Sequence, residues 1–472
     1  MTYPEAIQYL ESFVNYEKVP VWPYKESLKL ERIKDFLAVI DNPQDSLKCI
    51  HVAGTNGKGS TCAFISYILT EAGYKVGLYT SPHLTDFRER IRIINCRTSQ
   101  VARSRSKDFQ GMISQNDLVK FVERLRPHIE NYNQNSSYGP LSFFEAYTAL
   151  SFVYFKEKKV DFAVLETGLG GRLDATNVVS PLVCAITPIS YEHTQKLGNT
   201  LKEIATEKAG IIKARQCTPS TLLGTPSGRR APGHQLIVIT ASQEEEALEV
   251  IRDRCLEVGA KLYEVDKDIL YEKVKAQGLR VKGIMREYSD LKIRLLGEHQ
   301  FINAAVAVGV IEALQQHNIN VSADSIRKGL YNTVWPGRCE VIAEHPLVVL
   351  DGAQNVASAR ALKQAIKERF PDKRLILVLG ISKDKDIKGI CGELCPLAEE
   401  LILTQANNPR AASVQIIEDI IRHQNVKMSK CQLHKTKTVQ EARGLARSIA
   451  GKEDLVLVTG SLFVVGEARK LF

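Results

Sequence analysis

No stretch of the sequence is long and apolar enough to cross a membrane. The longest apolar runs, such as residues 375–381, are far shorter than the roughly 18 residues that a membrane-spanning helix needs. The N-terminal segment MTYPEAIQYLESF contains two acidic residues and no basic segment that leads into an apolar one, so it does not resemble a secretory signal. We therefore expect a cytoplasmic protein without a membrane partner.

Cysteine is too scattered for a disulfide framework, with ten residues spread over 472 positions. Only Cys391 and Cys395 lie close together, and this pair has neither a second cysteine pair nor histidines at the spacing of a zinc site. We expect free thiols throughout, with Cys391 and Cys395 as small core residues.

Neither sign of charge dominates strongly. The chain has 63 Lys and Arg against 54 Asp and Glu, a formal net charge of +9, and its basic residues form no stripe with interleaved aromatic residues. Nucleic acid is therefore not an expected partner, whereas a small anionic substrate suits the positive excess. The 44% hydrophobic and 25% charged residues are typical of globular proteins, and 472 residues suffice for two to three domains.

The order of apolar segments predicts an α/β fold. Two helices are expected within residues 4–40, and a strand at 47–52 then runs through a glycine-rich turn into a helix at 60–72. Helical segments such as 143–156 and 201–212 alternate with short apolar strands, which are expected at 76–79, 162–166, 183–186 and 236–239. A second series of strands is expected at 347–350, 375–380, 400–404 and 455–459.

This alternation favours a doubly wound, mostly parallel sheet in residues 1–333 and a smaller α/β domain in residues 334–472, with a boundary near Thr333. Two polar segments, 96–110 and 214–234, interrupt the pattern and are rich in Ser, Pro, Gly or Arg. We expect them to be exposed insertions, either simply solvated or holding an anion through their arginines.

A glycine-rich turn lies between the first expected strand and the following helix, which is the setting of a phosphate-binding loop. Backbone N–H groups there face the anion, glycine permits a close approach, and a lysine adds positive charge. The spacing differs from GxxxxGK[ST], because Gly54 lies only three positions before Gly57-Lys58 and Gly59 separates Lys58 from Ser60. We predict a nucleotide site made by Gly54, Thr55, Asn56, Gly57, Lys58, Gly59 and Ser60.

Polar residues follow three of the expected strands. Ser81 follows the strand at 76–79, Glu166 ends the strand at 162–166, and His193 lies shortly after the strand at 183–186. Ligands of an open parallel sheet bind beyond the carboxyl ends of its strands, so these groups are expected to converge there. We predict a Mg²⁺ site at this edge, with a hydrogen-bonded loop histidine as the alternative for His193.

Longer motifs follow one another along the chain: HVAGTNGKGST (51–61), YTSPHL with FRERI (79–84 and 87–91), LETGLGGRLDATN (165–177), EHTQKLGNTLKEIATEKAGIIK (192–213), LLGEHQFINA (295–304) and WPGR (335–338). Together they closely resemble the dihydrofolate synthase/folylpolyglutamate synthase family, which belongs to the Mur-type ATP-dependent amide ligases. The resemblance spans nearly the whole chain. It implies a P-loop-type central Mur ligase domain followed by a Rossmann-like C-terminal domain.

The resemblance implies a reaction in two steps. The γ-phosphoryl group of MgATP passes to a carboxylate of the pterin substrate, and the amine of L-glutamate then displaces phosphate to form an amide. The implied small-molecule substrates are ATP, L-glutamate, dihydropteroate and reduced folates. The segment LKLERI (28–33) resembles members that perform both reactions, so a bifunctional enzyme acting as a monomer is expected.

The resemblance also assigns residues. By analogy Ser81, Glu166 and His193 hold Mg²⁺, expected as two ions, and Asn303, Arg338 and Asp351 hold ATP beside the phosphate loop. Lys208 resembles the lysine that the family carries as a carbamate, although the helical pattern alone places it on a helix surface. Its attack on CO₂ needs a neutral amine, which burial near other cations favours.

Three segments resemble the family's pteroate-binding regions, and aromatic faces there suit a flat pterin or benzoyl ring. The residues concerned are Leu28, Glu31, Arg32, Phe143, Phe144, Glu145, Arg172, Leu173, Asp174 and Ala175. Without the resemblance, Phe143 and Phe144 read as core residues. Arg410 is expected either to grip a glutamate carboxylate or to lie on a surface loop.

The chain departs from the family at two site positions. Gln354 stands where a histidine is usual, and Glu192 replaces the aspartate before the metal histidine. Rival interpretations are a folylpolyglutamate synthase alone, a Mur-type ligase acting on a UDP-sugar peptide, and a folate- or nucleotide-binding protein that has lost catalysis. Only 46 residues precede the first expected strand, which is too few for the UDP-binding domain of the second rival.

Overall fold

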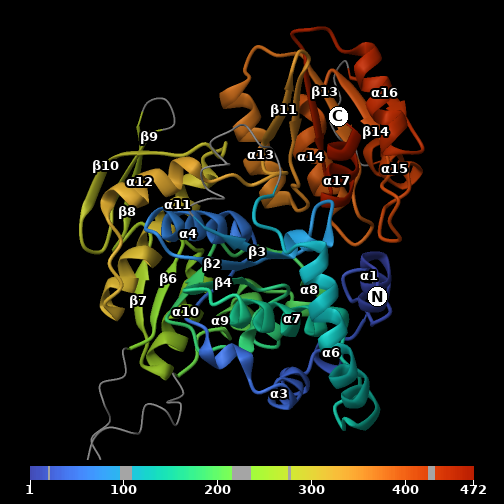
Figure 1. Ribbon diagram of the computed structural model, residues 1–472. Coiled ribbons are helices and arrows are strands. Elements are labelled where there is room, and N and C mark those ends of the chain that lie inside the picture. The colour runs from blue at the N-terminus through green and yellow to red at the C-terminus, as the bar shows by residue number, and fades with distance from the viewer. Residues whose placement is uncertain (20–21, 96–108, 215–234, 275–277, 424–430, 472) are drawn as a thin grey trace, which may run out of the picture.

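The computed structural model describes residues 1–19, 22–95, 109–214, 235–274, 278–423 and 431–471. Their strands form a seven-stranded, a three-stranded and a six-stranded sheet. Figure 1 shows the six-stranded sheet and its helices, in orange and red, beside the rest of the chain. The boundary expected near Thr333 falls between the last strand of the three-stranded sheet and the first strand of the six-stranded sheet.

The seven-stranded sheet has the order β3-β2-β4-β1-β5-β6-β7. Its strands are β1 (Cys49–Ala53), β2 (Val76–Tyr79), β3 (Ile91–Ile94), β4 (Phe162–Glu166), β5 (Val183–Ile186), β6 (Ile237–Thr240) and β7 (Lys261–Glu264). Only the pair β2–β3 is antiparallel, so the predicted mostly parallel sheet is confirmed. The five strands expected from apolar runs occur within two residues of their expected bounds, and β3 and β7 are additional.

Helices cover both faces of this sheet because its strands are apolar on both sides. In β1, Ile50 and Val52 pack in one core with α4 (Lys58–Glu71), α11 (His299–Ala313) and α12 (Ala323–Asn332). The alternating residues Cys49 and Ala53 pack in the opposite cores, with α7 (Phe143–Glu157), α9 (Leu201–Ala209) and α10 (Glu245–Val258). The sheet is therefore doubly wound, as the sequence predicts.

Further helices pack around the N-terminal half. They are α1 (Tyr3–Glu11), α2 (Tyr24–Ser27), α3 (Leu30–Val39), α6 (Gln115–Asn135) and the short α8 (Thr194–Leu197). The prediction that segment 96–110 is exposed is wrong at its end. The Phe109 ring is partly buried, 5.6 Å from the Trp335 ring and 5.2 Å from the Arg92 guanidinium carbon, because it covers that buried cation. Residues 96–108 and 215–234 lie outside the described part of the chain.

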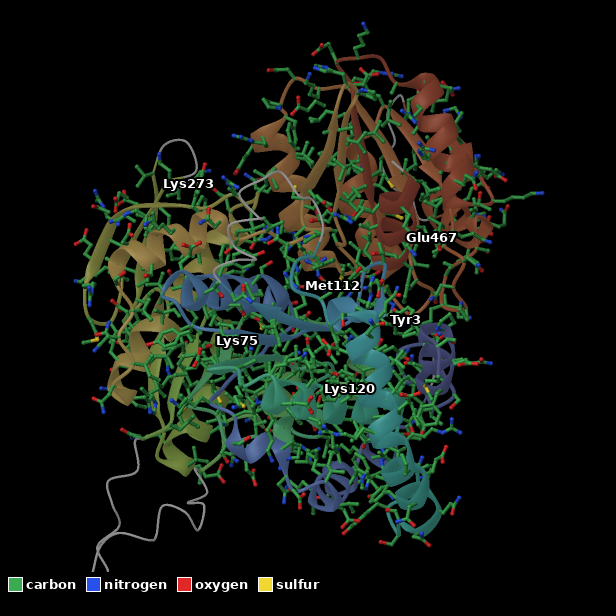
Figure 2. All side chains as sticks on the ribbon, viewed as in Figure 1. Tyr3, Lys75, Met112, Lys120, Lys273 and Glu467 are labelled. Carbon is green, nitrogen blue, oxygen red and sulfur yellow. The ribbon has the colours of Figure 1, made fainter. Side chains whose placement is uncertain are left out.

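A three-stranded antiparallel sheet follows, which the sequence pattern did not predict. Its strands are β8 (Leu270–Val274), β9 (Gly278–Lys282) and β10 (Glu287–Lys292). On β9, Leu279 and Val281 are buried while Arg280 and Lys282 are exposed, as expected for a sheet with one solvated face. Lys273 on β8 (Figure 2) lies 2.7 Å from Glu298 and 3.5 Å from Glu368, which connects this sheet to α13 (Val356–Arg369).

The six-stranded sheet has the order β11-β12-β16-β13-β14-β15, in which only β11–β12 is antiparallel. The strands are β11 (Glu340–Glu344), β12 (Leu347–Leu350), β13 (Leu375–Leu379), β14 (Glu400–Leu403), β15 (Gln432–Lys435) and β16 (Leu455–Thr459). Core clusters on its two faces include α13, α14 (Ile387–Leu394) and α15 (Val414–His423) on one side, and α16 (Val439–Ile449) and α17 (Leu462–Leu471) on the other. This arrangement confirms a second α/β unit.

The eight cysteines within the described ranges are free. Cys391 and Cys395 are buried in the core between α13, α14 and the sheet, as predicted for small core residues. In the same ranges, no helix is both long enough and apolar enough to pass through a lipid bilayer.

Candidate active site

The phosphate loop joins β1 to α4. Gly57, at φ +84°, immediately precedes the first helical residue, Lys58, so the N-terminus of α4 opens onto the loop. The N–H groups of a first helical turn have no acceptor within the helix and are available to an anion. The N–H groups of Thr55 and Asn56 instead donate to the Pro188 carbonyl (3.0 and 3.2 Å), which anchors the loop to the segment after β5.

Two glycines let neighbouring side chains pack directly against the loop. A Cβ on Gly57 would lie 2.2 Å from Asn303 Oδ1, and a Cβ on Gly59 would lie 2.9 Å from the Trp335 ring. The amide of Asn303 donates to Gln300 (3.0 Å), while its buried Oδ1 has no hydrogen-bond partner. The predicted nucleotide residue Asn303 thus presents an unused acceptor beside the loop.

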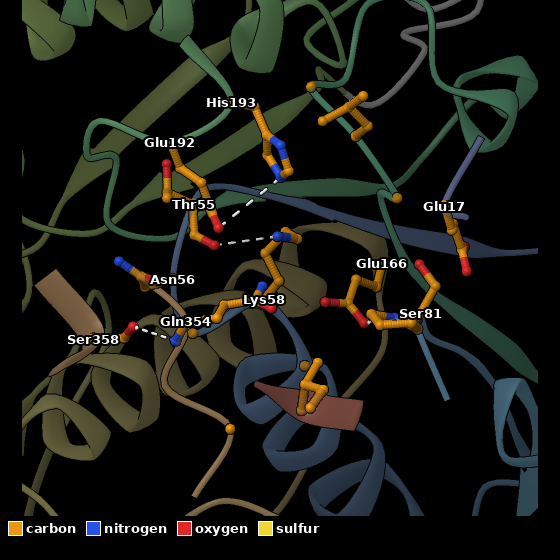
Figure 3. A pocket seen from close by; sticks show the side chains of 18 of the residues that line it. Glu17, Thr55, Asn56, Lys58, Ser81, Glu166, Glu192, His193, Gln354 and Ser358 are labelled. Carbon is orange, nitrogen blue, oxygen red and sulfur yellow. Dashed lines mark hydrogen bonds and ion pairs between the residues drawn. The ribbon is translucent and has the colours of Figure 1, made fainter. Parts of the chain in front are cut away.

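Two lysine ammonium groups bind carbonyls of the loop itself. Lys58 Nζ donates to the Thr55 carbonyl (3.2 Å, Figure 3), and the buried Lys208 Nζ donates to the Gly54 carbonyl (2.7 Å). Burial and the charge of Lys58 lower the pKa of Lys208 to about 7. The helical pattern's placement of Lys208 on a helix surface is therefore wrong, because the last turn of α9 directs this side chain inward.

The predicted metal ligands line the same cavity as the loop. Glu166 ends β4 and accepts a hydrogen bond from the Ser81 N–H (3.1 Å), which follows the adjacent strand β2 (Figure 3). Burial raises the pKa of Glu166, and the charge of Lys58 opposes this shift. Burial and then Lys385 lower the pKa of His193 to about 3, so its imidazole is neutral and one ring nitrogen has a lone pair available to a metal ion.

This donor set contains one carboxylate, one hydroxyl and one neutral imidazole. The described residues contain no cluster of three or more His, Cys, Asp and Glu side chains arranged to hold a metal ion. Mg²⁺ takes few protein ligands, prefers oxygen and keeps several waters, so Glu166 and Ser81 fit this ion better than zinc.

The C-terminal half contributes a buried cation to the cavity. Lys385 Nζ lies 2.9 Å from a carboxylate oxygen of Glu192, the residue before His193. Burial favours the neutral form of Glu192, but Lys385 holds its pKa well below the ordinary value. A second contact between the halves runs from Asn355 Nδ2 to Asn56 Oδ1 in the phosphate loop (2.9 Å). The loop therefore lies at the junction of the two halves.

Two other predicted ATP residues come from the segment between α12 and α13. Asp351 is buried and accepts hydrogen bonds from the N–H groups of Cys339 and Ala353 (both 2.8 Å), so it holds the turn that carries Arg338.

His299, which the sequence interpretation missed, also lines the cavity, and its buried Nδ1 has no hydrogen-bond partner. Burial and Arg338 lower the pKa of His299 to about 4. The sequence feature that could have identified His299 is the motif LLGEHQFINA, which contains it.

Gln354, the departure from the family pattern, lines the cavity as well. Its backbone N–H donates to Ser358 Oγ (3.1 Å), which places it at the start of α13 (Figure 3). An uncharged amide therefore faces the site where the family usually has a histidine.

The structure brings only part of the predicted substrate set to the cavity. The lining residues from that set are Leu28, Phe144, Glu145, Leu173, Asp174, Ala175 and Arg410. Asp174 accepts hydrogen bonds from the N–H groups of Gly168 and Leu169 (both 2.9 Å), so it shapes the glycine turn after β4.

Four predicted substrate residues, Glu31, Arg32, Phe143 and Arg172, are not among the lining residues. Phe143 is fully buried in the core under α7, and Glu31 is exposed. Arg32 Nε donates to both Glu145 carboxylate oxygens (2.9 and 3.0 Å). Arg172 forms an ion pair with Glu207, with 2.7 Å between Nη2 and Oε1. Gly54, a predicted nucleotide residue, also lies outside the lining, and its carbonyl accepts the hydrogen bond from Lys208.

The cavity has a volume of about 270 Å³ and receives side chains from both halves of the chain. Its lining includes the N-terminal residues Asn15, Tyr16, Glu17 and Trp22, together with Lys196 of α8, and none of these was predicted. Arg90 donates to both carboxylate oxygens of Glu17 (2.8 and 2.5 Å), which fixes this segment against the seven-stranded sheet. The segment has no helical or strand periodicity, so the sequence carried no signal for it.

Comparison with known proteins identifies relatives of both halves. Residues 132–311 match the Mur ligase middle domain, and residues 337–462 match the Mur ligase, glutamate ligase domain. A dihydrofolate synthase/folylpolyglutamate synthase of Bacillus subtilis (strain 168) is 36% identical over 448 residues, which are 93% of this chain and 94% of that protein.

Solved structures similar to this chain come from the same group of enzymes. Mycobacterium tuberculosis folylpolyglutamate synthase complexed with ADP has a TM-score of 0.83 at 29% identity, and the match covers 99% of this chain and 98% of that one. Escherichia coli FolC in complex with DHPP and ADP has a TM-score of 0.79 at 28% identity, with 100% and 97% coverage.

Proposed function

We propose that this chain, which belongs to the dihydrofolate synthase/folylpolyglutamate synthase family of Mur ligases, joins L-glutamate to dihydropteroate and to folates that already carry glutamate. The observation that carries the proposal is the shared cavity. The phosphate loop, Glu166 and the aromatic ring of Phe144 line one space between the two halves. A nucleotide phosphate and a carboxylate on a flat aromatic substrate can therefore meet there.

The residues of the loop explain how two anions are brought together. The N-terminus of α4 and the Lys58 ammonium attract the phosphates of ATP and offset the repulsion between the γ-phosphate and the substrate carboxylate. The Lys58 ammonium can exchange its hydrogen bond to the Thr55 carbonyl for one to a phosphate oxygen, because the existing hydrogen bond is weak at 3.2 Å. The reaction then depends on position and charge rather than on a protein nucleophile.

In the first step the substrate carboxylate takes the γ-phosphoryl group of ATP to form an acyl phosphate, and ADP leaves. In the second step the neutral amine of L-glutamate attacks the acyl carbon, the C–O bond to phosphate breaks, and the nitrogen releases one proton as the amide and inorganic phosphate form. Mg²⁺, with Ser81, Glu166 and His193 as its proposed ligands, supplies positive charge to the phosphate oxygens when it is bound. The depressed pKa of His193 supports this assignment, since an uncharged imidazole does not repel a cation.

We also propose that Lys208 becomes a carbamate. Its amine is buried, and its pKa of about 7 leaves a large neutral fraction at neutral pH, which is the form that attacks CO₂. Native mass spectrometry tests the modification as an added mass of one CO₂. Full activity of Lys208→Ala would contradict a catalytic role for this residue.

Product analysis tests the function. The protein is incubated with ATP and L-glutamate, and with dihydropteroate or a reduced folate as separate acceptors. We expect ADP release and a product longer by one glutamate with each acceptor, and no product without L-glutamate. Turnover with a UDP-linked muramyl peptide instead, or binding of folate and nucleotide without turnover, would contradict the proposal. We propose a monomer as the active form.

A further inference from the structure

Lys196 is a cation of the cavity whose ammonium group makes no direct ion pair in the described part of the chain. It lies in α8 and lines the cavity, and its Nζ is 4.3 Å from the centre of the Trp22 ring. Within the described ranges, no Asp or Glu oxygen lies at ion-pair distance from this ammonium. An indole face holds an ammonium group far less strongly than a carboxylate does, so the charge remains available to an incoming anion.

The neighbouring charges strengthen this conclusion. Burial and then Arg410 lower the pKa of Lys196 to about 8; the Asp384 carboxylate opposes this shift, and Lys385 adds to it. The nearby carboxylates are already engaged, because Asp384 binds Arg410 (2.5 Å) and Glu192 binds Lys385 (2.9 Å). Lys196 therefore adds a positive charge without an ion-pair partner of its own to a group of cations contributed by both halves, in which Asp384 is shared with Arg410.

The Trp22 contact holds the ammonium in place before a ligand arrives. The Trp22 ring packs on the Tyr16 ring at 4.4 Å, and its Nε1 donates to the Tyr16 carbonyl (3.2 Å). Both aromatic residues line the cavity. Because the aromatic support is itself fixed, the Lys196 side chain loses less conformational entropy on binding an anion than a free lysine would.

We propose that Lys196 binds a carboxylate of a glutamate unit and so determines specificity for glutamate, an inference that rests on the proposed function. When L-glutamate acts as the amine donor, neither of its two carboxylates reacts, and each needs a partner when it leaves water. A glutamate already present on a folate also has a carboxylate that does not react and that needs a positively charged partner when it leaves water. Dihydropteroate has no such group, since its one carboxylate must reach the phosphates.

The test compares Lys196→Gln with the wild type in steady-state kinetics. With dihydropteroate as acceptor, we expect the KM for L-glutamate to rise about tenfold or more, which is the usual loss for a charged hydrogen bond. We expect kcat and the KM for ATP to change less than twofold. Lys196→Arg should keep most of the affinity, and the exposed Lys202→Gln on α9 is the matched control that should behave as wild type.

A second acceptor identifies which carboxylate is bound. The second acceptor is a glutamylated folate. If only the KM for this folate rises, Lys196 holds the glutamate of the acceptor. If the KM for L-glutamate rises with both acceptors, Lys196 holds the incoming amino acid. Lys196→Met keeps the aliphatic chain over Trp22 and repeats the test if the glutamine variant is unstable.

Unchanged KM values in both neutral variants would overturn the inference while leaving the proposed function intact. No turnover by the wild type with either acceptor would overturn the proposed function, and this inference with it.

Discussion

Replacing Lys208 by methionine should make the protein more stable at neutral pH. The ammonium is buried beside the phosphate loop, and its pKa falls from 10.5 to about 7 on folding. Because the unfolded chain binds this proton more tightly, the lysine destabilises the folded state wherever the pH lies below 10.5, and the full cost applies below pH 7. Methionine has a similar length and no charge to desolvate.

The pKa shift gives the size of the effect. One pKa unit corresponds to about 1.4 kcal/mol, so Lys208 costs about 4 kcal/mol at pH 7 and about 2 kcal/mol at pH 9. Loss of the hydrogen bond to the Gly54 carbonyl opposes the gain by about 1 kcal/mol at either pH. The variant should therefore be more stable by about 3 kcal/mol at pH 7 and about 1 kcal/mol at pH 9.

Urea unfolding of both proteins at pH 7 and pH 9, in buffers without bicarbonate, measures this difference. A stability advantage of Lys208→Met that does not shrink between the two pH values would refute the reasoning, as would a more stable wild type at pH 7. Added bicarbonate should stabilise only the wild type if the carbamate forms, because binding to the folded state raises stability.

Two further substitutions test other parts of the site. Gly57→Ala places a Cβ 2.2 Å from Asn303 Oδ1 at a φ of +84°, so ATP affinity should fall at least about tenfold in calorimetric titration. Gly73→Ala has a similar φ of +94° but open space around it, and should bind ATP as wild type does. Arg32→Met leaves the buried Glu145 carboxylate unpaired and should lower the free energy of unfolding by about 3–5 kcal/mol in urea; an unchanged midpoint would disprove that role.

Much of the fold could be predicted because its central strands are apolar on both faces. Val76–Tyr79, Phe162–Glu166 and Val183–Ile186 match the expected bounds, since each run of apolar residues is as long as the strand itself. The phosphate loop was equally visible. Its glycines are required by Asn303 and Trp335 packing against the backbone, and such constraints leave a local signature in the sequence.

The three-stranded sheet was not predictable in the same way. Its strands have one solvated face, so in β9 (GLRVK) the buried Leu279 and Val281 alternate with the exposed Arg280 and Lys282. Such a short alternation in a charged segment resembles a loop. Phe109 was misjudged for a related reason, because one aromatic residue at the end of a polar segment does not reveal that it covers Arg92.

The site was less predictable where long-range contacts decide where a side chain points. The resemblance of segment 172–175 to the family's pteroate-binding regions suggested a substrate contact for Arg172, but Glu207 binds its guanidinium group. Lys208 looked exposed by helical spacing, yet it reaches the Gly54 carbonyl from a helix far away in the sequence. Trp22 of the N-terminal segment and Lys196 of α8 line the cavity together, although they are far apart in the sequence, and no local pattern encodes this contact.

The fate of the carboxylate oxygen tests the central claim most directly. Dihydropteroate labelled with ¹⁸O in its carboxylate is incubated with the protein, ATP, Mg²⁺ and L-glutamate, and the released phosphate is analysed by mass spectrometry. Transfer of the γ-phosphoryl group to the carboxylate predicts one ¹⁸O in each inorganic phosphate formed with the amide. Unlabelled phosphate accompanying amide formation would contradict activation of this carboxylate at the loop around Lys58.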